Sequence, residues 1–205
     1  MANRYAVANG NWSNTATWDG GTLPTSADVV RPNNFTVTID QNITVQQLIN
    51  DAAAPAVANG SFVLTGNFTV NISVSIVCLN TTVLTYNGTG SASIIGTTSS
   101  VPILPSPSIA TTTVVHSGTG TLIIDMLITS VGTGGTSGRT NVAITGTGST
   151  TNFLKTIQKF VSVGTSEASS AVLIVGTNNI VNTISILGWN SQIQQAITGI
   201  VHLQG

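Results

Sequence analysis

Apolar and polar residues alternate along much of the first half of the chain. The alternation is regular in segments 35–39 (FTVTI) and 68–76 (FTVNISVSI), as in a β-strand that buries one face. Thr, Val and Ile, which fill these segments, suit a pleated and half-buried surface. Two shorter segments, 62–64 and 83–86, have the same character, and Gly and Asn occupy the breaks. The pattern predicts short strands joined by tight turns.

A short motif of Gly and Thr recurs in the second half of the chain. It reads NGTG, SGTG, TGTG and VGTN, at 87–90, 117–120, 145–148 and 175–178, a spacing of about thirty residues. A second motif, SVGT, recurs at 130–133 and 162–165. Fixed periods of this length are typical of solenoids, in which each coil buries its apolar face against its neighbours. Glycine would supply the tight corner of each coil.

These patterns predict an all-β, single-domain β-solenoid, a right-handed β-helix. Residues 1–40 would form an N-terminal cap segment and residues 41–205 the solenoid body. A β-sandwich or jelly roll stays as the alternative, because these folds also contain many short strands.

Three segments depart from the strand pattern. Segment 152–161 places its large apolar residues on one helical face and its lysines opposite, which predicts a short helix. The pattern of segment 192–201 is ambiguous between a helix and a strand. Three prolines make segment 101–108 a loop or an extended crossing.

Charged residues make up 5% of the chain, hydrophobic residues 41%, and the formal net charge is −1. A disordered chain would have lower hydrophobicity and higher charge than this one, so the composition favours a packed structure. Five basic residues cannot form the electrostatic footprint of a nucleic-acid-binding protein, and no apolar run is long enough to span a membrane. We therefore expect no nucleic-acid partner and no membrane insertion. The N-terminus lacks the apolar stretch of a signal peptide, which predicts a protein made in a cytoplasm and not exported by the usual route.

The sequence predicts no catalytic, metal or cofactor site. Asp125 lies in an apolar run, so it should face outward or pair with Arg139; a glycosidase acid would require a second carboxylate. His116 and His202 lack the neighbouring ligands that a metal site needs. Cys78, also in an apolar run, should be a buried small hydrophobe. We expect a protein that is not an enzyme.

Residues 10–30 carry the most specific motif, GNWSNTATWDGGTLPTSADVV, followed by VTID at 37–40. The pattern GxWSNxATWxGGxxPTxxDxV resembles the opening of β-helical phage virion proteins, such as tail fibres, tail spikes and capsid decorations, and of bacterial G8-like and adhesin-type β-helices. The match covers about thirty of the 205 residues. A secreted adhesin would be expected to carry an export signal, so the resemblance favours the phage proteins.

Two interpretations of the tryptophans in this motif stay open. Trp12 and Trp18 could cover the apolar interior at the open end of a solenoid. Alternatively, these two and Trp189 could contact a glycan or a protein partner. Turn formation explains the acidic residues of the segment, which are Asp19, Asp28 and Asp40.

The resemblance implies a non-enzymatic bacteriophage virion structural protein. Its role would be that of a surface appendage, such as a capsid decoration, a head fibre or a short tail fibre component, and its location the virion. It further implies a homotrimer that contacts other phage structural proteins of the capsid or tail, with a host surface glycan as a further candidate partner. A polysaccharide-binding tail module for host attachment and a depolymerase are the alternatives.

Overall fold

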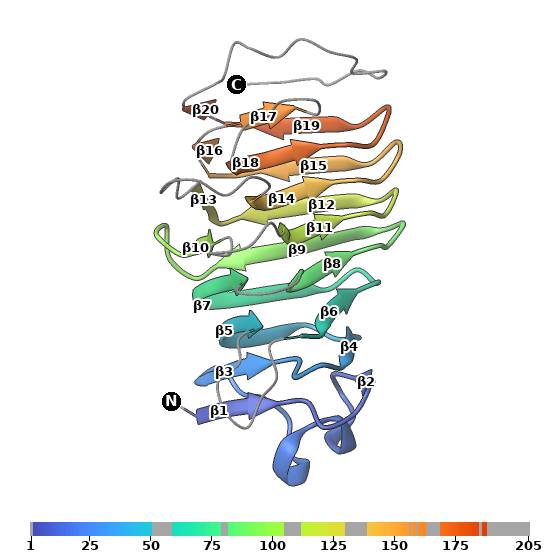
Figure 1. Cartoon of the computed structure of the whole chain (residues 1–205), viewed down its shortest axis with the longest axis vertical. Helices are drawn as coiled ribbons and strands as arrows, with labels where there is room; N and C mark the ends of the chain where they lie inside the picture. Colours follow the sequence, from blue (N-terminus) through green and yellow to red (C-terminus); the bar gives the residue numbers. More distant parts are fainter. Residues whose placement is uncertain are drawn as a thin grey trace.

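The protein is a parallel β-solenoid, seen in a computed structural model (Figure 1). The structure describes residues 2–50, 59–78, 82–104, 112–129, 139–155, 157–158, 160–162, 169–184 and 186–187. Every pairing between its named strands is parallel. The predicted β-helix is therefore confirmed, and the sandwich and jelly-roll alternatives, which need antiparallel sheets, do not apply.

Two sheets run along the axis of the solenoid. The first sheet begins with β1 (Ala2–Tyr5), β3 (Asp28–Arg31), β5 (Ile43–Asn50) and β7 (Thr69–Cys78). It continues in one column through β9 (Ser91–Gly96), β12 (Thr121–Asp125), β15 (Thr150–Phe153) and β19 (Ile180–Thr183), and in another through β10 (Pro102–Leu104), β13 (Leu127–Thr129), β16 (Ile157–Gln158) and β20 (Ile186–Leu187). The second sheet contains β2 (Gly10–Asn11), β4 (Thr36–Ile39), β6 (Ser61–Leu64), β8 (Leu84–Tyr86), β11 (Thr112–His116), β14 (Arg139–Ile144), β18 (Ser169–Ile174) and β17 (Phe160–Ser162).

Strand β7 is the point at which the coil changes shape. Its first half pairs with β9, where Val70 lies beside Ile94, and its second half pairs with β10, where Ile76 lies beside Ile103. One long strand in β5 and β7 thus becomes two short strands in each later coil. Residues 97–100, exposed at the break between β9 and β10, turn the chain between the two columns.

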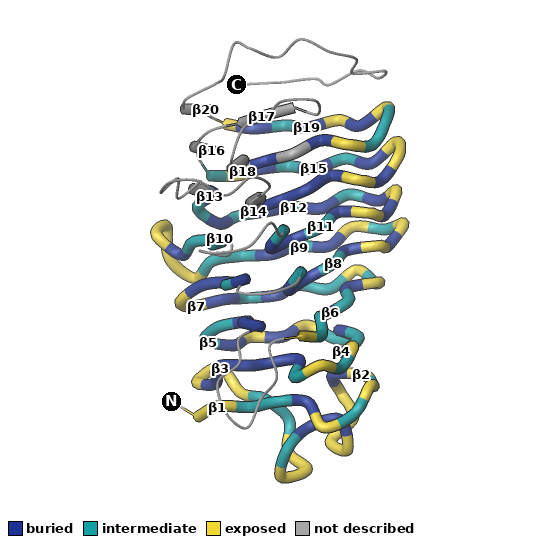
Figure 2. The backbone as a smooth tube through the Cα atoms, in the orientation of Figure 1, coloured by how far each residue is buried: buried dark blue, intermediate teal, exposed yellow. Residues whose placement is uncertain are grey.

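The core consists of apolar columns that run through successive coils, and Figure 2 shows these buried segments along both sheets. One column in the first sheet contains Val70, Ile94, Ile124 and Phe153. A second, in the other sheet, contains Val37, Phe62, Leu84, Val114, Val142 and Val172. Because neighbouring strands lie about 4.8 Å apart, each side chain packs against its equivalents above and below. Alternation in the sequence creates these columns.

The predicted glycine corners stack directly on one another. A Cβ atom on Gly118 would collide with the carbonyl oxygen of Gly88, and one on Gly146 with that of Gly118. The same relation joins Gly176 to Gly146. The period of about thirty residues is therefore the length of one coil in this half of the chain. Of the second motif, only Ser162, in β17, lies within the described residues.

The helix predicted for segment 152–161 is wrong. This segment instead contains the end of β15, then β16 and the start of β17. Residues 150–153 pair in register with β12 on one side and β19 on the other, and a helix would leave both neighbouring strands without these partners. In segment 101–108, Pro102 begins β10, a position where a missing N–H is tolerated. Residues 105–108 and segment 192–201 lie outside the described residues.

Candidate functional site

The N-terminal end of the solenoid is closed by the two tryptophans of the sequence motif. Trp12 and Trp18 are each 1% exposed, and their rings meet edge to face with centroids 4.8 Å apart. Trp18 Nε1 donates a hydrogen bond to the Trp12 carbonyl oxygen at 2.9 Å. Trp12 also lies against Phe62 of β6. This arrangement is the cover expected at an open solenoid end, and it leaves neither ring face accessible for stacking on a sugar. Trp189 lies outside the described residues.

Two short 3-10 helices carry the chain across this end. These are η1 (Thr15–Thr17) and η2 (Asp19–Gly21), and the side chain of Asn14 caps η1 by accepting from the Ala16 N–H. Strands β1 to β4 lie within the predicted cap segment, and β3 and β4 pair with β5 and β6. The segment therefore supplies coils of the solenoid as well as its cover.

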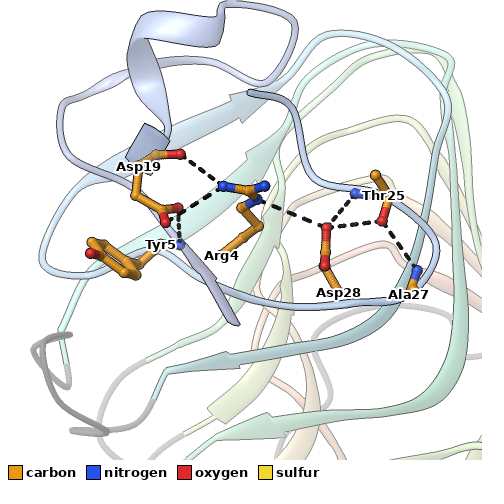
Figure 3. A network of polar contacts seen from close by, with 6 residues as sticks. All are labelled: Arg4, Tyr5, Asp19, Thr25, Ala27 and Asp28. Carbon is orange, nitrogen blue, oxygen red and sulfur yellow. Dashed lines mark hydrogen bonds and ion pairs between the residues drawn. The ribbon is translucent and has the colours of Figure 1, made fainter. Parts of the chain in front are cut away.

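A polar network holds the cover against the first coil (Figure 3). Arg4 Nη1 donates to the Asp19 carbonyl oxygen at 3.0 Å and lies 3.6 Å from its carboxylate. Asp19 Oδ1 accepts from the Tyr5 N–H at 3.0 Å. On the other side, Asp28 Oδ2 lies 4.0 Å from Arg4 Nε and accepts from both the N–H and the hydroxyl of Thr25. The turn-forming role predicted for Asp28 is confirmed.

Asp19 also has a protective effect on the edge strand. Among the described strands, β1 pairs on one side only, with β3, and open strand edges attract further strands. Because the Asp19 carboxylate occupies the Tyr5 N–H, that donor is not available to an incoming strand. Asp40 anchors the cover from another point, since it accepts from the N–H and the hydroxyl of Ser13 at 3.0 and 2.5 Å.

Asp125 forms an ion pair on the outer face of the first sheet. Its Oδ1 lies 2.9 Å from Lys155 Nζ, and both side chains are partly exposed. The outward orientation was predicted, but the described partner is Lys155; the side chain of Arg139 lies outside the described part of the structure. A glycosidase would need a second carboxylate about 5–9.5 Å from Asp125. Asp28, on β3 of the same sheet, is four strands from β12, or roughly 19 Å at the usual strand spacing, which is too far for such a pair.

His116 is a core residue at the end of β11. Its Nδ1 is 2.8 Å from the hydroxyl oxygen of Thr151, and its ring centroid is 5.1 Å from that of Tyr86. Burial lowers the pKa of His116 to about 4, and a hydrogen bond with the Gly120 backbone offsets part of this effect. The Tyr86 hydroxyl donates to the Gly90 carbonyl oxygen at 2.8 Å, and burial raises the pKa of Tyr86. These contacts describe a packed interior. His202 lies outside the described residues.

Asparagines that sequence reasoning missed connect successive coils. Asn42 Oδ1 accepts from the N–H of Thr69, which begins β7, and Asn67 Oδ1 accepts from that of Ser91, which begins β9. Asn9 does the same for Thr36 at the start of β4. In the sequence, the signal for these hydrogen bonds is an asparagine that lies one coil before the first residue of a strand. It can be recognised only once the length of a coil is known.

Within the described residues, no three His, Cys, Asp or Glu side chains gather in a metal-binding cluster. No helix there is long and apolar enough to cross a membrane. Cys78 is buried, as predicted. The fold and these contacts define the chain as a capped parallel β-solenoid. No protein-family model, curated protein or solved structure matches it.

Proposed function

We propose that this chain is a non-enzymatic structural protein of a bacteriophage particle. Its role would be that of a surface appendage, such as a capsid decoration, a head fibre or a short tail fibre component. The observation that carries the proposal is the capped β-solenoid formed around the virion-like N-terminal motif. Within this fold, four carboxylates take part in contacts that hold the structure together. Three accept hydrogen bonds from backbone N–H groups and one pairs with a lysine; they are Asp19, Asp28, Asp40 and Asp125.

The solenoid suits a mechanical role. Backbone hydrogen bonds between parallel strands run along the long axis in both sheets, and apolar columns fill the space between them. Bending such a rod would open several ladders at once, and each broken buried hydrogen bond has a free-energy cost. A rigid projection from a particle needs this property.

The proposed assembly is a homotrimer that contacts other capsid or tail proteins. A host surface glycan is a further candidate partner. Since Trp12 and Trp18 are buried in the cover, glycan contact would rely on other side chains. The candidate contact at Trp189 stays a prediction.

Proteomic analysis of purified particles tests the proposal. Particles would be collected by density-gradient centrifugation from a lysate of cells that make the protein, and then washed at high salt. We expect the chain to band with the major capsid protein at a fixed stoichiometry, and antibodies raised against it to label the particle surface in electron micrographs. A chain that remains at the top of the gradient, with no labelled particles, would contradict the proposal.

A further inference from the structure

The outer face of the first sheet changes character along the axis. In the earlier coils most of its outward positions are polar, such as Thr44, Asn71 and Ser91, and Val74 of β7 is the exposed large apolar residue among the described positions there. In the last coils, large apolar side chains take these positions: Leu154 is 45% exposed, Ile180 42% and Ile184 60%. We refer to these three residues as the apolar patch.

The strand register places the patch on one continuous surface. Ile180 is the fourth member of an outward column in which Ser91, Thr121 and Thr150 precede it. The alternate residues of β19, Val181 and Thr183, are buried, so Ile180 and Ile184 both face outward. Leu154 directly follows Phe153, the neighbour of Thr183, which puts Leu154 beside Ile184. Leu154 and Ile184 are thus adjacent, and Ile180 lies beyond Asn182 on the same face. Exposed apolar residues grouped on one face mark interaction sites.

The described polar groups around the patch are neutral as a set. Asp125 and Lys155 carry opposite charges and pair with each other at its border. Between Ile180 and Ile184 lies Asn182, whose Nδ2 donates to Asn152 Oδ1 at 2.7 Å. A carboxamide contains both a donor and an acceptor, so it can bond to another carboxamide. The same surface on a second copy of the chain would therefore be chemically complementary to it.

We infer that copies of this chain pack side by side through the apolar patch. Symmetric assembly brings equivalent regions of neighbouring subunits together, and a surface with one sign of charge would then repel itself. Here the apolar groups can pack on one another, the amides can pair, and the Asp125–Lys155 pair adds no net charge. The inference rests on the proposed assembly and names the surface that would form it.

Light scattering behind size exclusion, on the full chain and its variants, tests the inference. We expect wild type near three times the chain mass of 20.9 kDa. The double variant Ile180→Thr/Ile184→Asn, which restores residue types from earlier coils, should run at the mass of one chain with an unchanged circular dichroism spectrum. The matched control is Val74→Thr, a change at an exposed apolar residue of β7 in the same sheet, and it should keep the wild-type mass.

A second variant keeps the test decisive if the double variant fails to fold. Leu154→Glu would place a like charge on every copy, and we expect it to give single chains. A monomeric wild type over a wide concentration range would overturn the inference, and so would patch variants that keep the wild-type mass. Neither result would remove the chain from purified particles, so failure of this inference is distinguishable from failure of the proposed function.

Discussion

At the residue scale, the glycine corners are fixed by close approach between coils. The backbone of one corner lies directly over the next, and the Gly118 N–H donates to the Tyr86 carbonyl oxygen of the preceding coil. The space that a Cβ atom of Gly118 would need is occupied by backbone atoms of Asn87 and Gly88. Backbone atoms held in two ladders cannot move aside as a flexible side chain could.

Gly118→Ala should therefore destabilise the protein by about 1–3 kcal/mol, the usual cost of overpacking a filled site. The control is Gly148→Asn at the same corner one coil later. Gly148 has a φ of 69° and open space around it, and Asn178, its equivalent in the next coil, has a φ of 56°. Urea unfolding should show the alanine variant well below wild type and the asparagine variant within about 0.5 kcal/mol of it. Equal midpoints for the two variants would contradict the stacked-corner description.

His116 should make stability depend on pH. Because its pKa is lowered to about 4 from an ordinary value near 6.5, the unfolded chain binds a proton that the folded chain does not. Stability from this group is thus complete above about pH 6.5 and falls as the pH is lowered towards about 4. The total loss is on the order of 3 kcal/mol.

A urea series at several pH values measures this effect against His116→Gln, which does not titrate. The glutamine variant should lose less stability than wild type between pH 6.5 and 4, in spite of a lower starting stability. Carboxylates protonate in both proteins over this range, so the comparison isolates His116. Parallel curves would show that the histidine is accessible to protons in the folded state.

At the element scale, the sequence predicted the strands well where one face is buried. The segments that begin at Phe35 and Phe68 became β4 and β7 within a few residues. The glycine period located the corners from residue 87 onwards. These signals are local, because alternation and corner glycines reflect the environment of each coil by itself.

Features that depend on neighbouring coils were not predictable in this way. Segment 152–161 has a helical spacing of apolar residues, but pairing with β12 and β19 determines its structure. The partner of Asp125 is Lys155, one coil later, and the asparagine links also join one coil to the next. The split of β7 into two columns left no evident pattern in the sequence.

The cover is the element whose loss should affect one end of the solenoid most. Trp18→Ala removes a buried indole and its hydrogen bond to Trp12, and we expect a loss of about 3–5 kcal/mol. Trp18→Phe keeps a ring but lacks the donor, so its loss should be smaller. Hydrogen exchange should accelerate most in β1 and β3 and least in the coils beyond β9. Uniform acceleration in all coils would contradict a role confined to this end.

At the scale of the whole molecule, the two ends and the outer faces differ in character. The N-terminal end is closed by aromatic side chains and by carboxylates bonded to backbone N–H groups. The first sheet carries a mostly polar outer surface in its earlier coils and the apolar patch in its last described coils. This difference between the two ends would suit the proposed appendage, which makes its contacts at defined positions along its length.

Engineered disulfides test most directly whether successive coils stack in parallel and in register. Thr38 of β4 is the register neighbour of Val63 in β6, which in turn neighbours Thr85 in β8. Neighbouring strands are about 4.8 Å apart, and a disulfide needs Cα atoms within about 7 Å. We predict that Thr38→Cys/Val63→Cys forms an intramolecular disulfide on mild oxidation, seen as faster migration on non-reducing gels. Thr38→Cys/Thr85→Cys, two strands apart, should stay reduced. Cross-linking of the second pair and not the first would contradict the coil register.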